Sequence, residues 1–180
     1  RSGLRAAPRP ILCGKSVAPT TLLCPWTASL PQITDAVVLD AEHAPFDAAA
    51  LDISLLACRA AHTGGLVRVP DKRPATLQQA LDLGADGLVL PHIISADQAI
   101  SVLQAMYYRD GTRGFSNSPR AGGYGRANLA EHLAAEDGRH AVIAQIEDRE
   151  ALEHLDQLAR LERIDCLLVG RADLSVSLGA

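Results

Sequence analysis

The chain has 180 residues, which is about the size of one domain. Hydrophobic residues make up 48% and charged residues 21%, so the chain can bury a sizeable core and is not disordered. A formal net charge of −4 argues against a nucleic acid as the main partner, and no apolar run approaches the ~18 residues of a membrane span. The four cysteines form no C-x-x-C pair, which is typical of reduced thiols in a cytoplasmic protein.

Short apolar runs alternate along the chain with longer amphipathic stretches. The runs predict strands at 20–26, 36–40, 66–69, 87–90, 141–146 and 166–169. Apolar residues recurring every three or four positions predict helices at 48–61, 75–83, 96–107, 129–135 and 149–161. The helix-capping residues Asp47, Ser95 (with Gln98 three residues on) and Asp148 support these helix starts. The alternation indicates an α/β fold, with a parallel sheet covered by helices.

Two architectures fit this pattern, and both fit a single domain over residues 1–180 with a lead segment at 1–19. An open doubly wound sheet that binds a dinucleotide would place G-x-G-x-x-G after the first strand, where residues 24–27 read Cys-Pro-Trp-Thr. A (β/α)8 TIM barrel needs about 250 residues. The visible βα units number about six, so a barrel would be incomplete at its C-terminal side.

Polar and charged side chains collect at the carboxyl ends of the predicted strands. They are Asp40, Glu42, His43, Arg68, Gln145, Glu147, Arg171 and Asp173. In a parallel α/β protein these ends form the ligand site. Arg68 could instead form a buried ion pair, and Glu147 and Asp173 could favour helix starts, but their gathering at one end favours a site. We expect His62, His132, His140 and His154, on helices or loops, to be solvated.

The residue types at the strand ends favour a metal-assisted reaction. Two carboxylates and an amide, with no cysteine or clustered histidine, suit Mg²⁺ or Mn²⁺ better than zinc. Arg68 offers a planar fork for a substrate carboxylate, and Asp40 could orient His43 as a general base. A Schiff-base mechanism is poorly supported, since the only two lysines, Lys15 and Lys72, lie in the lead segment and in a loop.

Six segments of the chain resemble the HpcH/HpaI aldolases, which are class II, metal-dependent pyruvate aldolases. These segments are 38–45 (VLDAEHAP), 67–70 (VRVP), 80–85 (ALDLGA), 111–114 (GTRG), 145–151 (QIEDREA) and 170–175 (GRADLS). The resemblance implies a (β/α)8 barrel of the phosphoenolpyruvate/pyruvate type, of which this chain carries about six βα units. It also implies a homo-oligomer, usually a hexamer, that acts on a small-molecule 2-oxo acid.

The resemblance also implies roles for individual residues. Glu147 and Asp173 would hold the divalent metal, which would be Mg²⁺, Mn²⁺ or Co²⁺. Arg68 and Gln145 would contact the pyruvate part of the substrate, and the backbone of Gly170 and Ala172 would hold its carboxylate. His43, oriented by Asp40, would handle the proton of the 4-hydroxyl group. Asp82 would reach a neighbouring subunit's site. Two features depart from the family: Arg171 stands where a proline is usual, and segment 27–34 is short.

The activity that this resemblance implies is reversible retro-aldol cleavage of a 4-hydroxy-2-oxo acid to pyruvate and an aldehyde, through a metal-stabilised enolate. One alternative is a CoA-thioester lyase of the related citrate lyase beta-like group, although no basic surface for the nucleotide is evident. The other is a degenerate barrel that binds a 2-oxo acid without turnover. The missing strands seven and eight favour this last alternative, because an open barrel exposes a sheet edge.

Overall fold

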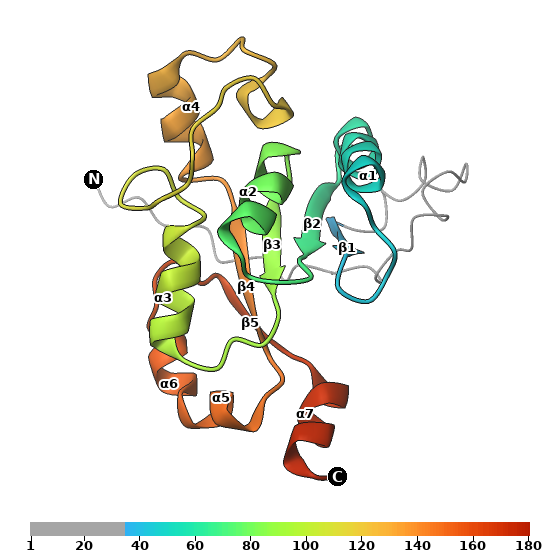
Figure 1. The fold of residues 1–180 in the computed structure, drawn as a ribbon, viewed down its shortest axis with the longest axis vertical. Coiled ribbons are helices and arrows are strands. Elements are labelled where there is room, and N and C mark those ends of the chain that lie inside the picture. The colour runs from blue at the N-terminus through green and yellow to red at the C-terminus, as the bar shows by residue number, and fades with distance from the viewer. Residues whose placement is uncertain (1–34) are drawn as a thin grey trace.

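In the computed structural model, residues 35–180 are described, and they contain one parallel sheet (Figure 1). Its strands are β1 (Ala36–Asp40), β2 (Gly64–Arg68), β3 (Gly87–Leu90), β4 (Ala141–Ile146) and β5 (Cys166–Val169). The five strands predicted in this part of the chain are confirmed, with β2 beginning two residues earlier than expected. The predicted strand at 20–26, the lead segment and segment 27–34 lie outside the described residues.

Helices separate the strands, as the sequence predicts. They are α1 (Ala48–Ala60), α2 (Pro74–Asp82), α3 (Ala96–Gln104), the 3-10 turn η3 (Arg120–Gly122), α4 (Leu129–Glu136), α5 (Arg149–Glu153), α6 (Leu155–Leu158) and α7 (Arg171–Leu178). The single helix predicted at 149–161 is wrong, because the chain leaves helical geometry at His154 (φ −112°, ψ 6°) and divides into α5 and α6. The helix predicted at 96–107 ends at Gln104.

The helix starts test the predicted caps. Asp47 accepts a hydrogen bond from the Ala50 N–H and Ser95 from the Gln98 N–H, so both caps are confirmed. Asp148 occupies the N-cap position of α5, so this helix start is confirmed, but its side chain makes no capping bond and pairs instead with a histidine after β3.

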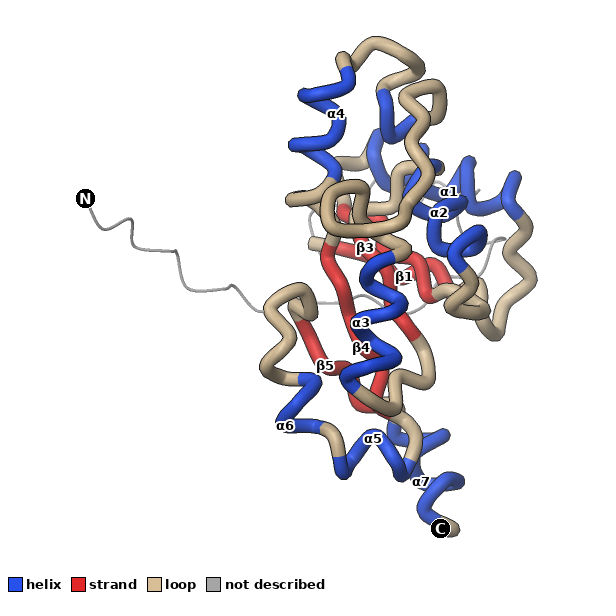
Figure 2. The backbone as a smooth tube through the Cα atoms, turned by 60° about the vertical axis from the view of Figure 1, so that its left-hand side comes forward, coloured by secondary structure: helices blue, strands red, loops and turns tan. Residues whose placement is uncertain are grey.

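The strand order is β1-β2-β3-β4-β5, so each strand pairs with the next along the chain. This order is typical of a barrel, whereas an open doubly wound sheet reverses direction at a switch point. Figure 2 shows the strands side by side as one sheet, with α7 projecting beyond it at the end of the chain. The topology therefore resolves the choice that the sequence leaves open in favour of barrel-type winding.

Apolar residues cover both faces of the sheet. Alternate residues point to opposite faces, so Val37, Leu39, Leu88, Val142 and Ala144 pack into the main core with the helices. The residues between them on the strands form a second, smaller cluster of Ala36, Leu66, Val89 and Ile143. The strands are thus apolar on both faces, as in other parallel α/β proteins.

β5 is the most exposed strand. Within the described part of the chain it pairs with β4 alone, and Leu168 and Val169 are 44% and 54% exposed. None of the helices in residues 35–180 has the length and apolar character needed to cross a membrane.

Candidate active site at the carboxyl ends of the strands

β1 and β2 end on an ion pair between Asp40 and Arg68, which face each other in the strand register. Arg68 Nε donates to Asp40 Oδ1 at 2.8 Å, and a second N–H of Arg68 donates to Oδ2. Burial raises the pKa of Asp40, but the hydrogen bonds from Arg68 and from the backbone N–H of His43 outweigh it and lower that pKa. Asp40 is therefore a carboxylate that fixes the guanidinium group of Arg68 at the carboxyl ends of β1 and β2.

Glu42 lies beside this pair on the turn after β1. Its Oε2 atom is 3.4 Å from Arg68 Nε and 3.6 Å from His43 Nε2. Burial raises the pKa of Glu42 by more than the positive charge of Arg68 lowers it. Glu42 Oε2 is buried and accepts no hydrogen bond from the described residues.

Glu147 follows β4 and is the most deeply buried carboxylate of the group, with its side chain 1% exposed. It accepts hydrogen bonds from the His92 backbone N–H at 2.9 Å and from the Gln145 side-chain amide. A Cβ atom at Gly170 would lie 2.7 Å from Glu147 Oε2, so only glycine lets the start of α7 approach this carboxylate so closely. Three strand ends therefore converge on Glu147.

His92 is the residue of this site that sequence reasoning missed. It follows β3 and Pro91, and its Nδ1 atom lies 2.9 Å from Asp148 Oδ2 and 3.5 Å from Glu147 Oε1. Burial lowers its pKa, but the hydrogen bond with Asp148 and the nearby carboxylates outweigh it and raise that pKa. The sequence predicts His43 at this site and does not predict His92. The available signal was the Leu-Pro-His sequence directly after an apolar strand.

The donors at this site fit a divalent cation. Glu42, His92 and Glu147 each offer one ligand atom, and these atoms lie within 4.8 Å of one another. Gln145 Oε1, also buried, has no hydrogen-bond partner among the described residues. Two carboxylates, an imidazole and an amide oxygen are all common ligands of divalent metals.

Two other predicted residues lie at the rim. The His43 side chain is 62% exposed; Asp40 accepts from its backbone N–H, and its ring lies next to Glu42. Asp173 and Ala172 lie in the first turn of α7 and are exposed, as is Arg171. No hydrogen bond or ion pair joins Asp173 to another described residue, so its role as a metal ligand stays a prediction.

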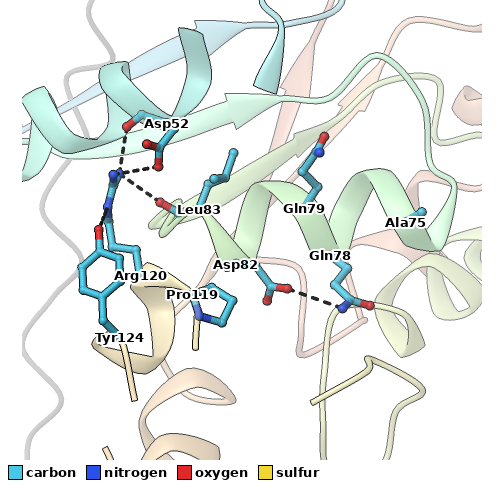
Figure 3. A pocket seen from close by; sticks show the side chains of 9 residues that line it. All are labelled: Asp52, Ala75, Gln78, Gln79, Asp82, Leu83, Pro119, Arg120 and Tyr124. Atoms are coloured by element: carbon cyan, nitrogen blue, oxygen red, sulfur yellow. Dashed lines mark hydrogen bonds and ion pairs between the residues drawn. The ribbon is translucent and has the colours of Figure 1, made fainter. Parts of the chain in front are cut away.

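Asp82 lies away from this group, at the end of α2. It lines an open hollow of about 670 Å³ between α2 and the η3 segment (Figure 3). Arg120 crosses the hollow to the Asp52 carboxylate and the Leu83 carbonyl. Whether Asp82 serves a neighbouring subunit's site stays a prediction.

Asp82 is also tied to a buried ionic network. Arg113 donates to Asp82 Oδ1 at 2.7 Å and lies 3.6 Å from Glu136 Oε2, which pairs in turn with His140 Nε2 at 3.1 Å. The prediction that His140 and His132 are solvated is wrong. They are 8% and 2% exposed, because His140 pairs with Glu136 and His132 Nε2 with the Tyr108 hydroxyl.

Lys72 also approaches the strand ends. Its Nζ atom donates to the carbonyls of Pro91 and His92, at 2.9 and 3.2 Å. Burial lowers the pKa of the Lys72 amine by more than the negative charges of Asp148, Glu42 and Glu147 raise it. Lys72 thus holds the backbone of the segment that carries His92.

Comparison with known proteins agrees with this geometry. The model of the HpcH/HpaI aldolase/citrate lyase family matches residues 28–180. The chain belongs to this family. A solved HpcH/HpaI aldolase/citrate lyase family protein from Burkholderia cenocepacia superposes with a TM-score of 0.79 at 33% identity, covering 85% of this chain and 62% of that one. The fold is accordingly α/β of the TIM-barrel type, represented here by part of a barrel.

Two curated relatives of this HpcH/HpaI family chain are aldolases by name. The hydroxypyruvate/pyruvate aldolase of Paraburkholderia phytofirmans is 36% identical over 152 residues, which cover 81% of the chain and 58% of that protein. The 5-keto-4-deoxy-D-glucarate aldolase of Shigella boydii is 32% identical over 146 residues, 81% of the chain and 56% of that protein. The chain therefore spans little more than half the length of these curated relatives.

Proposed function

We propose that this protein is a divalent-metal-dependent carbon–carbon lyase. It would cleave a 4-hydroxy-2-oxo acid reversibly to pyruvate and an aldehyde. The observation that carries the proposal is the convergence of Arg68, held by Asp40, with the buried Glu147 and Gln145 at one end of the sheet. This arrangement supports the proposal, because a guanidinium fork can bind a substrate carboxylate and a carboxylate–amide pair can help to hold a divalent metal.

Glu147 and Asp173 would hold the metal, which would be Mg²⁺, Mn²⁺ or Co²⁺. A bound divalent ion supplies Lewis-acid polarisation of the 2-oxo group and stabilises the negative charge that develops there. Glu147 suits this role because it is buried and held by two hydrogen bonds. Asp173 lies one helical turn after Gly170, which contacts Glu147.

The remaining residues would orient the substrate. Arg68 keeps N–H groups beyond those that bind Asp40, and these can donate to the 2-oxo acid. The backbone N–H groups at the start of α7, next to Gly170 and including that of Ala172, can receive the carboxylate, because the first N–H groups of a helix have no partner within it. The Gln145 amide would lie against the pyruvate part.

His43 would move the proton. Its exposed ring at the rim can accept the proton of the 4-hydroxyl group. The oxygen then forms the aldehyde carbonyl as the C3–C4 bond breaks, and the bonding electron pair passes to C3 and its conjugated 2-oxo group. Arg68 would help to stabilise that enolate charge, and a proton delivered to C3 completes pyruvate.

Pyruvate release from a panel of 4-hydroxy-2-oxo acids, with Mg²⁺ or Mn²⁺ and again with EDTA, tests the proposal. Glu147→Gln should lower metal-stimulated kcat/KM by about 100-fold or more, as expected for the loss of a charge-stabilising group. Glu150→Gln, the same change at an exposed position of α5, should leave it unchanged. Undiminished turnover in Glu147→Gln would refute the assignment of this ligand.

The same assay separates the alternatives. Cleavage of a malyl- or citramalyl-CoA, with no release from hydroxy-oxo acids, would replace the aldolase by a CoA-thioester lyase of the citrate lyase beta-like group. Metal binding and 2-oxo acid binding without any turnover would leave a barrel that only binds a 2-oxo acid.

A further inference from the structure

We propose that Lys72 is a positioning residue for the metal site: it orients the peptide group before His92, and that group holds the carboxylate of Glu147. The inference rests on the proposed function in one respect, which is that Glu147 is a metal ligand, and it adds no ligand to the site. Lys72 lies on the loop between β2 and α2, whereas His92 follows β3. The lysine therefore connects the carboxyl ends of two neighbouring strands.

One peptide group links the lysine to the carboxylate. Lys72 Nζ donates to the Pro91 carbonyl oxygen at 2.9 Å. The N–H of that same peptide group belongs to His92 and donates to Glu147 Oε1, also at 2.9 Å. Because a peptide group is planar, fixing the direction of its carbonyl also fixes the direction of its N–H. A rotation that turned the carbonyl away from Lys72 would turn the N–H away from Glu147.

The positive charge of Lys72 also strengthens the hydrogen bond to Glu147. A cation that binds a peptide carbonyl polarises the peptide group, so its N–H becomes a stronger donor. This polarisation matters most where water is excluded, and the Glu147 side chain is only 1% exposed. Lys72, the peptide group and Glu147 thus form one chain of hydrogen bonds from an ammonium to a carboxylate.

The backbone conformation at His92 depends on such support. His92 has φ +52°, a region that residues other than glycine seldom occupy. Lys72 Nζ also donates to the His92 carbonyl, at 3.2 Å, so one amine binds the carbonyls on both sides of the strained residue. Backbone strain persists only where the surroundings enforce it, and these two hydrogen bonds do so.

The surroundings of the Lys72 amine fit this role. Lys72 is half-buried, and burial lowers the pKa of its amine in spite of the nearby carboxylates, of which Asp148 acts most strongly. A desolvated amine needs hydrogen-bond partners, and the two carbonyls after β3 provide them. The lysine therefore acts on the backbone of the site.

The consequence for the metal follows from how Glu147 is held. Its Oε1 accepts from the His92 N–H, and its Oε2 accepts from the Gln145 side-chain amide. Loss of the first hydrogen bond would leave the carboxylate oriented from one side only. Removing a group that orients a metal ligand weakens metal binding by about 10–100-fold. Lys72 acts one step further out, so we expect an effect near the lower end of that range.

Titration calorimetry of Mn²⁺ with three variants tests the inference. Lys72→Met removes the donors and keeps a long apolar stem, so it should weaken Mn²⁺ binding about tenfold. Lys72→Arg keeps N–H donors for the two carbonyls and should retain most of the affinity. Arg73→Met removes one positive charge at the adjacent residue, whose side chain is 78% exposed, and should bind Mn²⁺ as the parent protein does.

The sign of the change separates positioning from charge. Lys72→Met removes a positive charge near the site, which by itself would let a cation bind more tightly. Weaker binding in Lys72→Met alone therefore supports the proposal. Unchanged or tighter binding in Lys72→Met, or equal weakening in all three variants, would overturn it. A parent protein that binds no Mn²⁺ would overturn the proposed function together with this inference, so the two failures are distinguishable.

Hydrogen exchange followed by NMR gives a second readout, which requires neither metal nor activity. The His92 N–H should exchange about tenfold faster in Lys72→Met than in the parent protein, as expected when a hydrogen bond to a charged group is weakened. Arg73→Met should match the parent protein. The N–H groups within β4 should keep their exchange rates in both variants, which would show that the sheet is intact. An unchanged rate at His92 in Lys72→Met would overturn the proposal.

Discussion

Arg68 shows how much depends on the shape of one side chain. Its guanidinium binds both oxygens of Asp40, and its Nε atom also lies 3.4 Å from Glu42 Oε2. Arg68→Lys keeps the charge but loses the planar fork, so we expect kcat/KM for pyruvate release to fall by about 100-fold, as for removal of a preorganised donor. Steady-state kinetics checks this, with Arg59→Lys on α1 as the matched control. Activity near that of the parent would show that charge alone suffices.

The two described cysteines differ in reactivity for a physical reason. Cys58 lies on the buried face of α1, and this burial, with the charge of Asp86, raises the pKa of its thiol to about 11. Cys166 is exposed at the start of β5. We expect iodoacetamide at pH 8 to modify Cys166 and to spare Cys58 until urea unfolds the chain, as peptide mass mapping would show. Equal rates in the native state would contradict the burial of Cys58.

The sequence predicts those residues of the candidate site that lie at the ends of strands. Asp40, Arg68, Gln145 and Glu147 end apolar strands, and parallel winding brings such ends together. His92 could not be predicted in this way. The Leu-Pro-His sequence puts it after an apolar strand, but its backbone also adopts positive φ and Lys72 binds the neighbouring carbonyls, and these two features have no sequence pattern.

At the scale of elements, the network around Glu136 ties α4 to the loop after α3. Burial raises the pKa of Glu136, but the hydrogen bond with His140 and the charges of His140, Arg139 and Arg113 outweigh it, so that pKa lies below its ordinary value of 4.5. The stabilisation is therefore complete above pH 4.5 and is lost as the pH falls through the folded-state pKa.

Glu136→Gln should remove this stabilisation. We expect the free energy of unfolding at pH 7 to fall by about 2 kcal/mol, because His140 loses its charged hydrogen-bond partner and the buried Arg113 keeps only Asp82. Its decline between pH 5 and pH 3 should also be shallower than in the parent protein. Urea unfolding at several pH values measures both, and Glu131→Gln, at an exposed position of α4, is the control. A parallel pH profile in Glu136→Gln would show that other carboxylates govern acid stability.

Strands were predicted well where a continuous apolar run marks them. The runs of β1, β3, β4 and β5 have the predicted bounds, and this holds even for the exposed strand β5, which pairs with β4. The stretch after Asp148 was predicted less well. Its apolar periodicity is helical, but the backbone at His154 leaves helical geometry, and periodicity does not report such a break.

At the scale of the whole molecule, β5 and α7 present apolar side chains to solvent. Val169 on β5 is 54% exposed and Val176 on α7 is 75% exposed. The outer edge of β5 meets no other described strand, and an exposed apolar edge with free N–H and C=O groups is a template for pairing with another chain. We therefore expect this 180-residue chain to self-associate through β5.

Val169→Lys tests this expectation, because a lysine on an edge strand opposes strand pairing. Sedimentation velocity over a range of concentrations should show a smaller average mass for Val169→Lys than for the parent chain. Val176→Lys makes the same change at a more exposed valine that lies on a helix, so it should reduce association less. If the two variants reduce association equally, the chains associate through exposed apolar side chains and not specifically by strand pairing at β5. If neither does, the β5 edge is not the contact surface.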